Sequence, residues 1–468
     1  MFHKGILAKL LWQFSLGLLL FSGLSNPVPV RTEGLRIAIA EQMAETGNWI
    51  VPHLWGDPIF TKPPGFYWVL SFAQGIGGAH SLIGMRLVSV FSLIGMALAS
   101  VFYLGVWGGS RFTGFLVYLT AMATTLASLG QVPTAEMDIP FSFWVLWFWM
   151  ASIDLGTSGQ SLTKGLFAWK SFGLGVLGGM AVLFKWTAPA FFFPAFLWIL
   201  IFGRVSLARK VWGSVLCGIG VLVLPCIWMG GIVSQGQLSG LYDAILSEAL
   251  PHLSPAHHTR SYPFMEWITF PVQVIGMSMP VSLPLLFVML FRTRVVINYL
   301  SKPWPFILIG SLFIWTLIPG HRPRHALPVS IGIAIISIPL WKCILKNNSK
   351  KIVLFGCILL TLGISKSIYS FGTSSIRAHE GKMVESASEI KKCVGQEPLG
   401  LFQIKEDGFI WLTHIARVVK VSDEKYTDWV ICYKKNEDIW ISKGYVVHRR
   451  VELSGNTVLT LLFGKTKS

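Results

Sequence analysis

Charged residues are scarce in this chain. They make up 13% of its 468 residues, whereas hydrophobic residues make up 53% and the mean hydropathy is +0.60. A soluble protein of this length cannot cover its surface with so few charges. The composition therefore excludes an ordinary soluble protein and predicts a polytopic membrane protein. Its 20 Trp and 32 Phe fit this class, because aromatic residues gather at bilayer interfaces.

Cysteine is also rare, and metal-binding patterns are lacking. None of the six cysteines forms a CxxC motif, and no set of His, Cys and Asp has the spacing of metal ligands. The sequence therefore predicts no cofactor and leaves a need for a divalent metal open. Four cysteines lie in or beside apolar runs and fit small hydrophobic residues. Cys393 and Cys432 either pair, if the tail is extracytoplasmic, or stay free.

Acidic residues are outnumbered, 22 against 39 basic ones, which gives a net charge of +17. Nucleic-acid binding is one interpretation of a basic chain. However, the Lys and Arg side chains mostly lie in short loops between apolar runs, which is the positive-inside pattern of membrane proteins. We therefore expect membrane lipids, and no nucleic acid, as partners.

Long apolar runs are abundant. A spanning helix needs about 20 apolar residues, and several runs approach this length. We expect about eleven transmembrane helices within a membrane domain of residues 1–370. The first run is either a cleaved signal peptide or, in our preferred interpretation, an uncleaved helix. The runs lie at about 5–24, 82–107, 113–130, 139–153, 171–184, 187–203, 211–232, 265–291, 304–320, 325–341 and 352–370.

The positive-inside pattern assigns the sides of these helices. With the N-terminus inside, the basic loops face the cytoplasm, and residues 25–65 form the first outer loop. Of the ten acidic residues among the first 370, only Asp154 then faces inward. Within the outer loop, Ile37, Ala40 and Met43 recur at helical spacing, which predicts a surface-lying helix that Gly47 ends.

The last 98 residues have a different composition. Residues 371–468 hold 12 of the 22 acidic and 15 of the 39 basic residues. An odd number of spans places them outside. The segments WLTHIARVVKV, DWVICYKK and YVVHRRVEL resemble short strands. We predict a small extracytoplasmic mixed α/β domain, and it carries no catalytic motif.

Carboxylates of the outer loops are candidate general bases. Glu33 would stand at the end of a spanning helix, where it could take a proton from an acceptor hydroxyl or could be a solvated surface acid. Glu136 and Asp138 lie two residues apart in PTAEMDIP at a helix entrance. They could act in catalysis or could favour the helix N-terminus alone.

Cations of the outer loops are candidate phosphate ligands. In FTKPPG the prolines fix the backbone beside Lys62, which either neutralises a lipid phosphate or snorkels to ordinary headgroups. Arg322 and Arg324 lie in the dense cationic segment PGHRPRHALP, and arginine suits bidentate phosphate binding. Lys185 stands between two apolar runs. In the outer loop 233–264, His257, His258 and Tyr262 are expected to join them as a donor or acceptor loop.

These segments resemble a known family. The stretch EGLRIAIAEQMAETGNWIVPHLWGDPIFTKPPGFYW is similar to the first outer loop of the bacterial ArnT-like and protein O-mannosyltransferase-like enzymes, which have the GT-C membrane fold. AEMDIP, LFKW and HRPRHALP match later family blocks in the same order, over roughly residues 1–345. The resemblance implies an inverting transfer of a sugar from a polyprenyl-phosphate donor. The acceptor would be lipid A, another envelope glycan or a protein, on the periplasmic side of a bacterial inner membrane.

Two positions depart from the family pattern. Thr32 stands where the family commonly has Asp before Glu33, and Thr61 stands where it often has Glu before Lys62. The base is then Glu33, Asp138 or Glu136. The alternative function is a lipid-linked sugar transporter or a non-catalytic carrier-binding protein. Few charges lie at the centres of the spans, which favours the transferase over a transporter.

Overall fold

The computed structural model of the protein divides into two compact units. The first, which we call the helical unit, contains Met1–Phe21, Phe60–Phe66 and Val88–Lys366. The second, which we call the mixed unit, contains Ser22–Ile59, Tyr67–Leu87 and Ser367–Ser468. The structure describes residues 2–468 except 77–80, 106–109, 129–131, 254–263, 284, 286–301, 319–321, 346–357, 359–360, 363, 367, 369–377, 423–426, 454–456 and 465–468.

The described part of the chain contains five helices that are long and apolar enough to cross a membrane. The protein is thus an α-helical polytopic membrane protein, as its composition predicts. The number of eleven spans stays a prediction, and most of the run 352–370 lies outside the described residues. The five candidates are Leu82–Leu104 (α4), Asp138–Ser161 (α6 with the short helix η1), Lys164–Phe184 (α7), Leu207–Ser234 (α9) and Pro323–Trp341 (η3 with most of α15).

Other helices complete the helical unit, and the boundary between the units passes through α3 and α4. Their bounds are Phe2–Phe21 (α1), Gly65–Gln74 (α3), Arg111–Ser128 (α5), Pro189–Phe202 (α8), Leu238–Leu253 (α10), Phe264–Gly276 (α11), Pro303–Leu317 (α14), Pro323–Ala326 (η3) and Leu327–Leu345 (α15).

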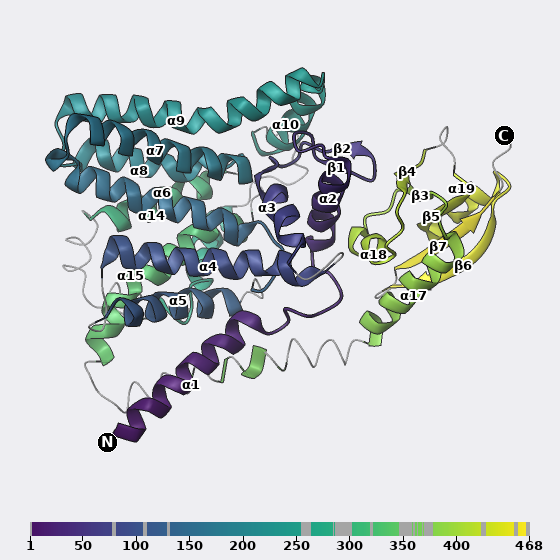
Figure 1. The fold of residues 1–468 in the computed structure, drawn as a ribbon, viewed down its shortest axis with the longest axis horizontal. Coiled ribbons are helices and arrows are strands. Elements are labelled where there is room, and N and C mark those ends of the chain that lie inside the picture. Colours follow the sequence, from purple (N-terminus) through teal and green to yellow (C-terminus); the bar gives the residue numbers. More distant parts are fainter. Residues whose placement is uncertain are drawn as a thin grey trace. The chain divides into compact units, whose positions relative to one another are not determined.

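Helices α6, α7, α8 and α9 lie side by side (Figure 1). Glycines allow α7 and α9 to approach closely. A Cβ atom on Gly175 would lie 2.1 Å from the carbonyl oxygen of Cys217, and one on Gly220 would lie 2.4 Å from that of Phe172. Small residues at such contacts are typical of packed membrane helices, where close van der Waals contact drives association.

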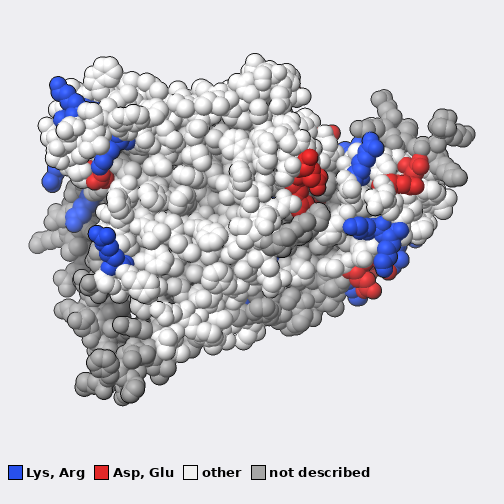
Figure 2. Space-filling view, viewed as in Figure 1, with Lys and Arg blue, Asp and Glu red and all other residues white. Residues whose placement is uncertain are grey.

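The helical unit carries its exposed basic residues at one end of the helix stack. On the face shown in Figure 2, the surface over α6 to α9 is almost free of charge, and Lys and Arg gather at the left edge. The turn between α6 and α7 lies at this end, because Lys170 of α7 pairs with Asp154 of α6 at 3.2 Å. Arg209, at the start of α9, donates to the carbonyl of Gly159 at 2.6 Å. An uncharged surface of this kind suits contact with lipid.

The first-loop helix of the mixed unit matches its sequence pattern. Helix α2 runs Glu33–Thr46 and buries Ile37, Ala40 and Met43. It ends at Gly47, whose φ of 68° is the left-handed conformation that glycine adopts without strain. A two-residue hairpin follows, formed by β1 (His53–Leu54) and β2 (Asp57–Pro58).

The tail forms a five-stranded sheet with the order β4-β3-β5-β7-β6. Strand β3 is parallel to β4 and β5, and β7 is antiparallel to β5 and β6. The mixed α/β composition that the sequence predicts is confirmed. The bounds are Ala378–Val394 (α17), Leu399–Phe402 (β3), Asp407–Leu412 (α18), Val418–Lys420 (β4), Trp429–Tyr433 (β5), Lys434–Asn436 (η4), Glu437–Ile441 (α19), Val446–Glu452 (β6) and Val458–Phe463 (β7).

Two expectations for the tail differ from the structure. The segment WLTHIARVVKV is not one strand: Trp411 and Leu412 end α18, and only Val418–Lys420 pairs in the sheet. The burial of all four residues from Phe409 to Leu412 explains this, because a helical turn buries consecutive apolar residues that a strand with one solvent face would expose. Cys393 and Cys432 do not pair; both are free.

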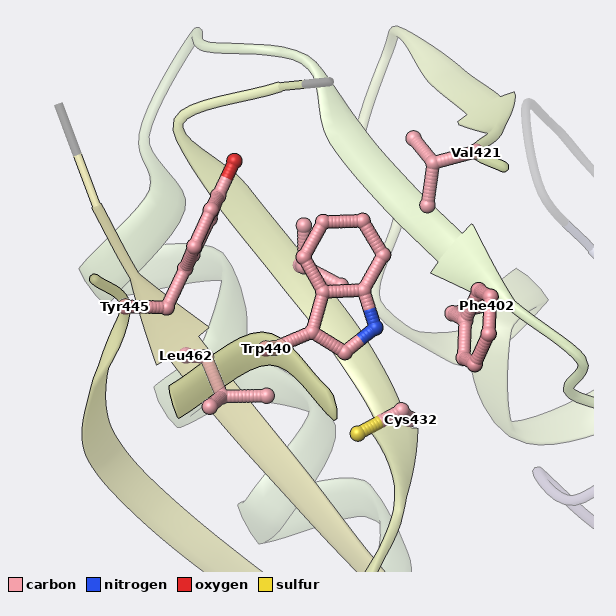
Figure 3. Close-up of a cluster of buried hydrophobic side chains, with 7 residues drawn as sticks. Phe402, Val421, Cys432, Trp440, Tyr445 and Leu462 are labelled. Atoms are coloured by element: carbon pink, nitrogen blue, oxygen red, sulfur yellow. The ribbon is translucent and has the colours of Figure 1, made fainter. Parts of the chain in front are cut away.

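Cys432 instead belongs to the core of the sheet. It lies with Phe402, Val421, Tyr445 and Leu462 around Trp440 (Figure 3). Burial raises the pKa of the Cys432 thiol to about 12, so it is a small apolar residue and not a reactive one.

Candidate functional site

An ion pair joins α6 and α7 at the end opposite to their connecting turn. Asp138 is the first residue of α6, and Lys185 directly follows α7; the Lys185 ammonium contacts the Asp138 carboxylate. The two side chains are only 9% and 12% exposed. The pair stands 16 residues, about 24 Å along the helix axis, from the Asp154–Lys170 pair. The N-terminus of α6 also favours the negative charge of Asp138.

Lys185 reaches this position because α7 stops there. Its backbone is extended, with φ −147° and ψ 132°, and Pro189 opens α8 four residues later. Lys185 lies 5.1 Å from the centre of the Phe141 ring, on the first turn of α6. A cation over an aromatic face is stabilised by the ring quadrupole, so Phe141 helps to hold the ammonium at the membrane end of the stack.

Arg324 and His325 join this pair from η3. The ring of His325 lies 5.8 Å from that of Trp315, and its backbone N–H donates to the carbonyl of Arg322 at 2.9 Å. Arg324 and His325 both interact electrostatically with Asp138. A segment more than 130 residues later in the chain thus supplies two more donors to the same place.

Lys62 is the fourth donor. Its segment packs on the end of α7 because Gly65 has no side chain: a Cβ atom there would lie 2.8 Å from the carbonyl oxygen of Leu183. The rings of Phe66 and Phe184 lie 6.1 Å apart. Lys62 donates to the carbonyl of Thr61 at 3.0 Å and acts electrostatically on His325.

We call Lys62, Lys185, Arg324 and His325 the cationic cluster. Its members come from three separate segments and surround Asp138. Such a set can bind an anion with several oxygens, such as a phosphate, through charge-assisted hydrogen bonds. Among the residues that the structure describes, no group of three or more His, Cys, Asp or Glu is placed to hold a metal ion.

The remaining predicted residues of this region have different positions. Glu136 is buried two residues before Asp138, and Arg322 is exposed before the cluster in η3. His257, His258 and Tyr262 lie outside the described residues. Their predicted contribution to a donor or acceptor loop stays a prediction.

Glu33 lies in the mixed unit and has a different environment. It is fully buried and forms a two-pronged ion pair with Arg86, whose Nε and Nη2 donate to its carboxylate at 3.1 and 2.8 Å. The backbone N–H of Val30 donates to the same carboxylate at 2.8 Å. A general base must reach the proton it removes. This geometry favours a structural role for Glu33 over its predicted role as a base.

Arg86 is the functional residue that sequence reasoning missed. It is 1% exposed, and besides Glu33 it donates to the carbonyls of Gly23, Leu24, Asn26 and Val28 at 2.6 to 3.3 Å. A single arginine in the first turns of an apolar helix was the available signal. A guanidinium in such a place requires a carboxylate or carbonyl partners, because burying an unpaired charge is costly.

The sequence is similar to those of characterised transferases. The undecaprenyl phosphate-alpha-4-amino-4-deoxy-L-arabinose arabinosyl transferase 2 of Pseudomonas fluorescens strain Pf-5 is 27% identical over 358 residues, which are 69% of this chain and 55% of the relative. The transferase 2 of strain Pf0-1 is 30% identical over 321 residues, 64% of this chain and 53% of that one. The chain thus spans about half the length of these relatives. No family model matches the chain.

Solved structures share the fold. The crystal structure of ArnT from Cupriavidus metallidurans in the apo state superposes with a TM-score of 0.66 and 14% identity, over 98% of this chain and 97% of that chain. The same protein bound to undecaprenyl phosphate gives a TM-score of 0.65, with the same coverage and identity. The chain is therefore a homologue of the ArnT transferases and has the GT-C membrane fold that its motifs predict.

Proposed function

We propose that the protein is an inverting glycosyltransferase that moves a sugar from an undecaprenyl-phosphate donor to an envelope acceptor. The donor class follows the names of the relatives, so its sugar is an aminopentose, and lipid A is the preferred acceptor class. The observation that carries the proposal is the cationic cluster around Asp138. Four donors from distant parts of the chain meet one buried carboxylate at one end of a membrane helix stack.

The chemistry is a single displacement. An acceptor oxygen forms a bond to the anomeric carbon while the bond from that carbon to the phosphate oxygen breaks, and the bonding electrons leave with the phosphate. The cationic cluster stabilises the charge that develops on the departing polyprenyl phosphate. Asp138 takes the proton of the acceptor, with Glu136 as the second candidate base. Backside attack inverts the anomeric centre.

Lys185 has two roles in this scheme. Without donor its ammonium pairs with Asp138. A bound phosphate shares that ammonium, which weakens its hold on the carboxylate and makes Asp138 a better proton acceptor. Glu33 stays paired with Arg86 throughout and acts by holding the outer-loop structure.

The sidedness of the site supports a periplasmic reaction at a bacterial inner membrane. The Asp154–Lys170 pair and Arg209 mark the basic end of the stack, and the cationic cluster lies at the other end of α6 and α7. Positive-inside sorting places the basic end in the cytoplasm and the cluster outside. In the same scheme, residues 1–370 are the membrane catalytic domain and residues 371–468 an extracytoplasmic domain.

The two Asp–Lys pairs provide a matched test. Transfer of a labelled sugar from a synthetic undecaprenyl-phosphate donor to lipid A is measured with purified protein in nanodiscs. Asp138→Asn should lower the rate by about 10²–10⁴-fold, the usual contribution of a general base. Asp154→Asn, which breaks the other α6–α7 pair, should leave it close to wild type.

Two outcomes would contradict the proposal. Equal rates for Asp138→Asn and wild type would remove Asp138 as the base. Donor binding without turnover for lipid A, other envelope glycans and protein acceptors would instead indicate a carrier-binding protein or a transporter on this fold.

A further inference from the structure

The mixed unit contains a cavity of 520 Å³. Three parts of the chain form its wall: the linker after α1, the start of α4, and the tail helices α17 and α18 with the residues that follow. This volume lies within the range of small-molecule sites, about 300–1,000 Å³. All lining residues belong to the mixed unit, so the cavity is separate from the cationic cluster.

The chemistry of the wall is selective. It offers hydroxyls such as those of Ser81 and Ser388, the amide of Asn26, and the basic side chains of Lys391 and His414. The lining residues include no Asp or Glu. Hydroxyl and amide groups both donate and accept, as sugar hydroxyls do, and a cationic wall without carboxylates favours an anion.

The wall is also held in place by buried contacts. Arg86 donates to the carbonyls of Leu24 and Asn26 at 3.3 and 2.6 Å, and these residues line the cavity. On the other side, Trp411 donates to the Glu41 carboxylate at 2.7 Å. A site whose walls are fixed before binding loses less entropy on binding.

We propose that this cavity binds the anionic sugar headgroup of the acceptor glycolipid. The assignment to the acceptor rests on the proposed function; the binding of a phosphorylated sugar does not. Lys391 contacts the phosphate, and the hydroxyl and amide groups contact the sugar. Glu33 and Arg86 are positioning residues, because they fix the linker wall and do not line the cavity.

Calorimetry on the full-length protein in nanodiscs tests the site. The probe is glucosamine 6-phosphate, with glucosamine and inorganic phosphate as comparisons. The phosphorylated sugar should bind more tightly than either. Lys391→Met should weaken it about tenfold, the effect of losing one charge-assisted hydrogen bond. Lys392→Met is the matched control: this exposed lysine is next along α17 but does not line the cavity, so affinity should not change.

Equal affinities in both lysine variants, or no binding by the wild type, would overturn the site. A second arm identifies the source of the sugar. Lipid A in the nanodisc should compete with the probe; absence of competition would overturn the assignment to a lipid headgroup.

Asp138→Asn separates this proposal from the proposed function. This variant should bind glucosamine 6-phosphate like the wild type while its transfer is lost. If wild-type protein binds the probe but transfers to no acceptor, the proposed function fails and the sugar site stands.

Discussion

Gly34→Ala should destabilise the contact between α2 and α18, although alanine is the better helix former. Gly34 and Gly408 are the second residues of these two helices and face each other. A Cβ atom on Gly34 would lie 2.2 Å from the Cα atom of Gly408 and 2.5 Å from its backbone nitrogen. Backbone atoms cannot rotate away as a side chain can, so the helices themselves must separate.

The magnitude follows from these distances. The contact must open from 2.2 Å to the 3.4 Å at which ordinary van der Waals contact begins, by about 1.2 Å. Overpacking of this kind costs about 1–3 kcal/mol, and a backbone clash belongs at the upper end. The separation also strains the bonds from Trp411 to Glu41 (2.7 Å) and from Trp55 to Asp407 (3.0 Å). A helix-propensity gain of at most about 1 kcal/mol does not offset this cost.

Hydrogen exchange measured by mass spectrometry reports on this contact. A loss of about 3 kcal/mol should speed exchange in Glu33–Thr46 and Asp407–Leu412 by about 100-fold. Gly408→Ala is the control, because its Cβ atom would lie 3.6 Å from Pro29 and 3.9 Å from Gly34. Exchange rates for Gly34→Ala that match those of Gly408→Ala would refute the reasoning.

Two further predictions concern buried carboxylates of the mixed unit. Glu33→Gln leaves the buried Arg86 without its counter-charge and should cost about 3–5 kcal/mol of unfolding free energy in denaturant titrations, whereas Glu45→Gln on the exposed face of α2 should cost almost nothing; equal losses would contradict the role of the ion pair. The hydrogen bonds of Arg450 lower the pKa of Glu437 below its ordinary value of 4.5, so this carboxylate contributes stability above pH 4.5 that is lost as the pH falls through its folded-state pKa. Glu437→Gln should flatten the acid side of the curve of unfolding temperature against pH, and an unchanged slope would count against this assignment.

Local patterns predicted much of the helical structure. The spacing of Ile37, Ala40 and Met43 with Gly47 after them predicted α2 and its end, because burial period and capping are local properties. The tail was harder. Trp411 and Leu412 were predicted as strand, since a short apolar run fits either a strand or a buried helical turn until its packing is known.

The candidate site was predicted as a set of residue types, but not as a set of pairs. Asp138 and Lys185 were both predicted as site residues, with different roles and without their ion pair. Nothing in the sequence links residues 47 positions apart, because the end of α7 and the start of α6 meet only through helix packing. Arg86 was missed for the same reason: its partners lie 53 to 63 positions away, in a loop whose path the sequence does not give.

The contacts of Arg86 also restrict how the chain can vary. One guanidinium accepts no change in the length of Gly23–Val28, because an inserted or deleted residue would move carbonyl oxygens out of its reach. The identity of the side chains there matters less, since the bonds go to the backbone. In homologues that keep this arginine and the acid that pairs with it, we expect the loop to vary in sequence and to keep a constant number of residues.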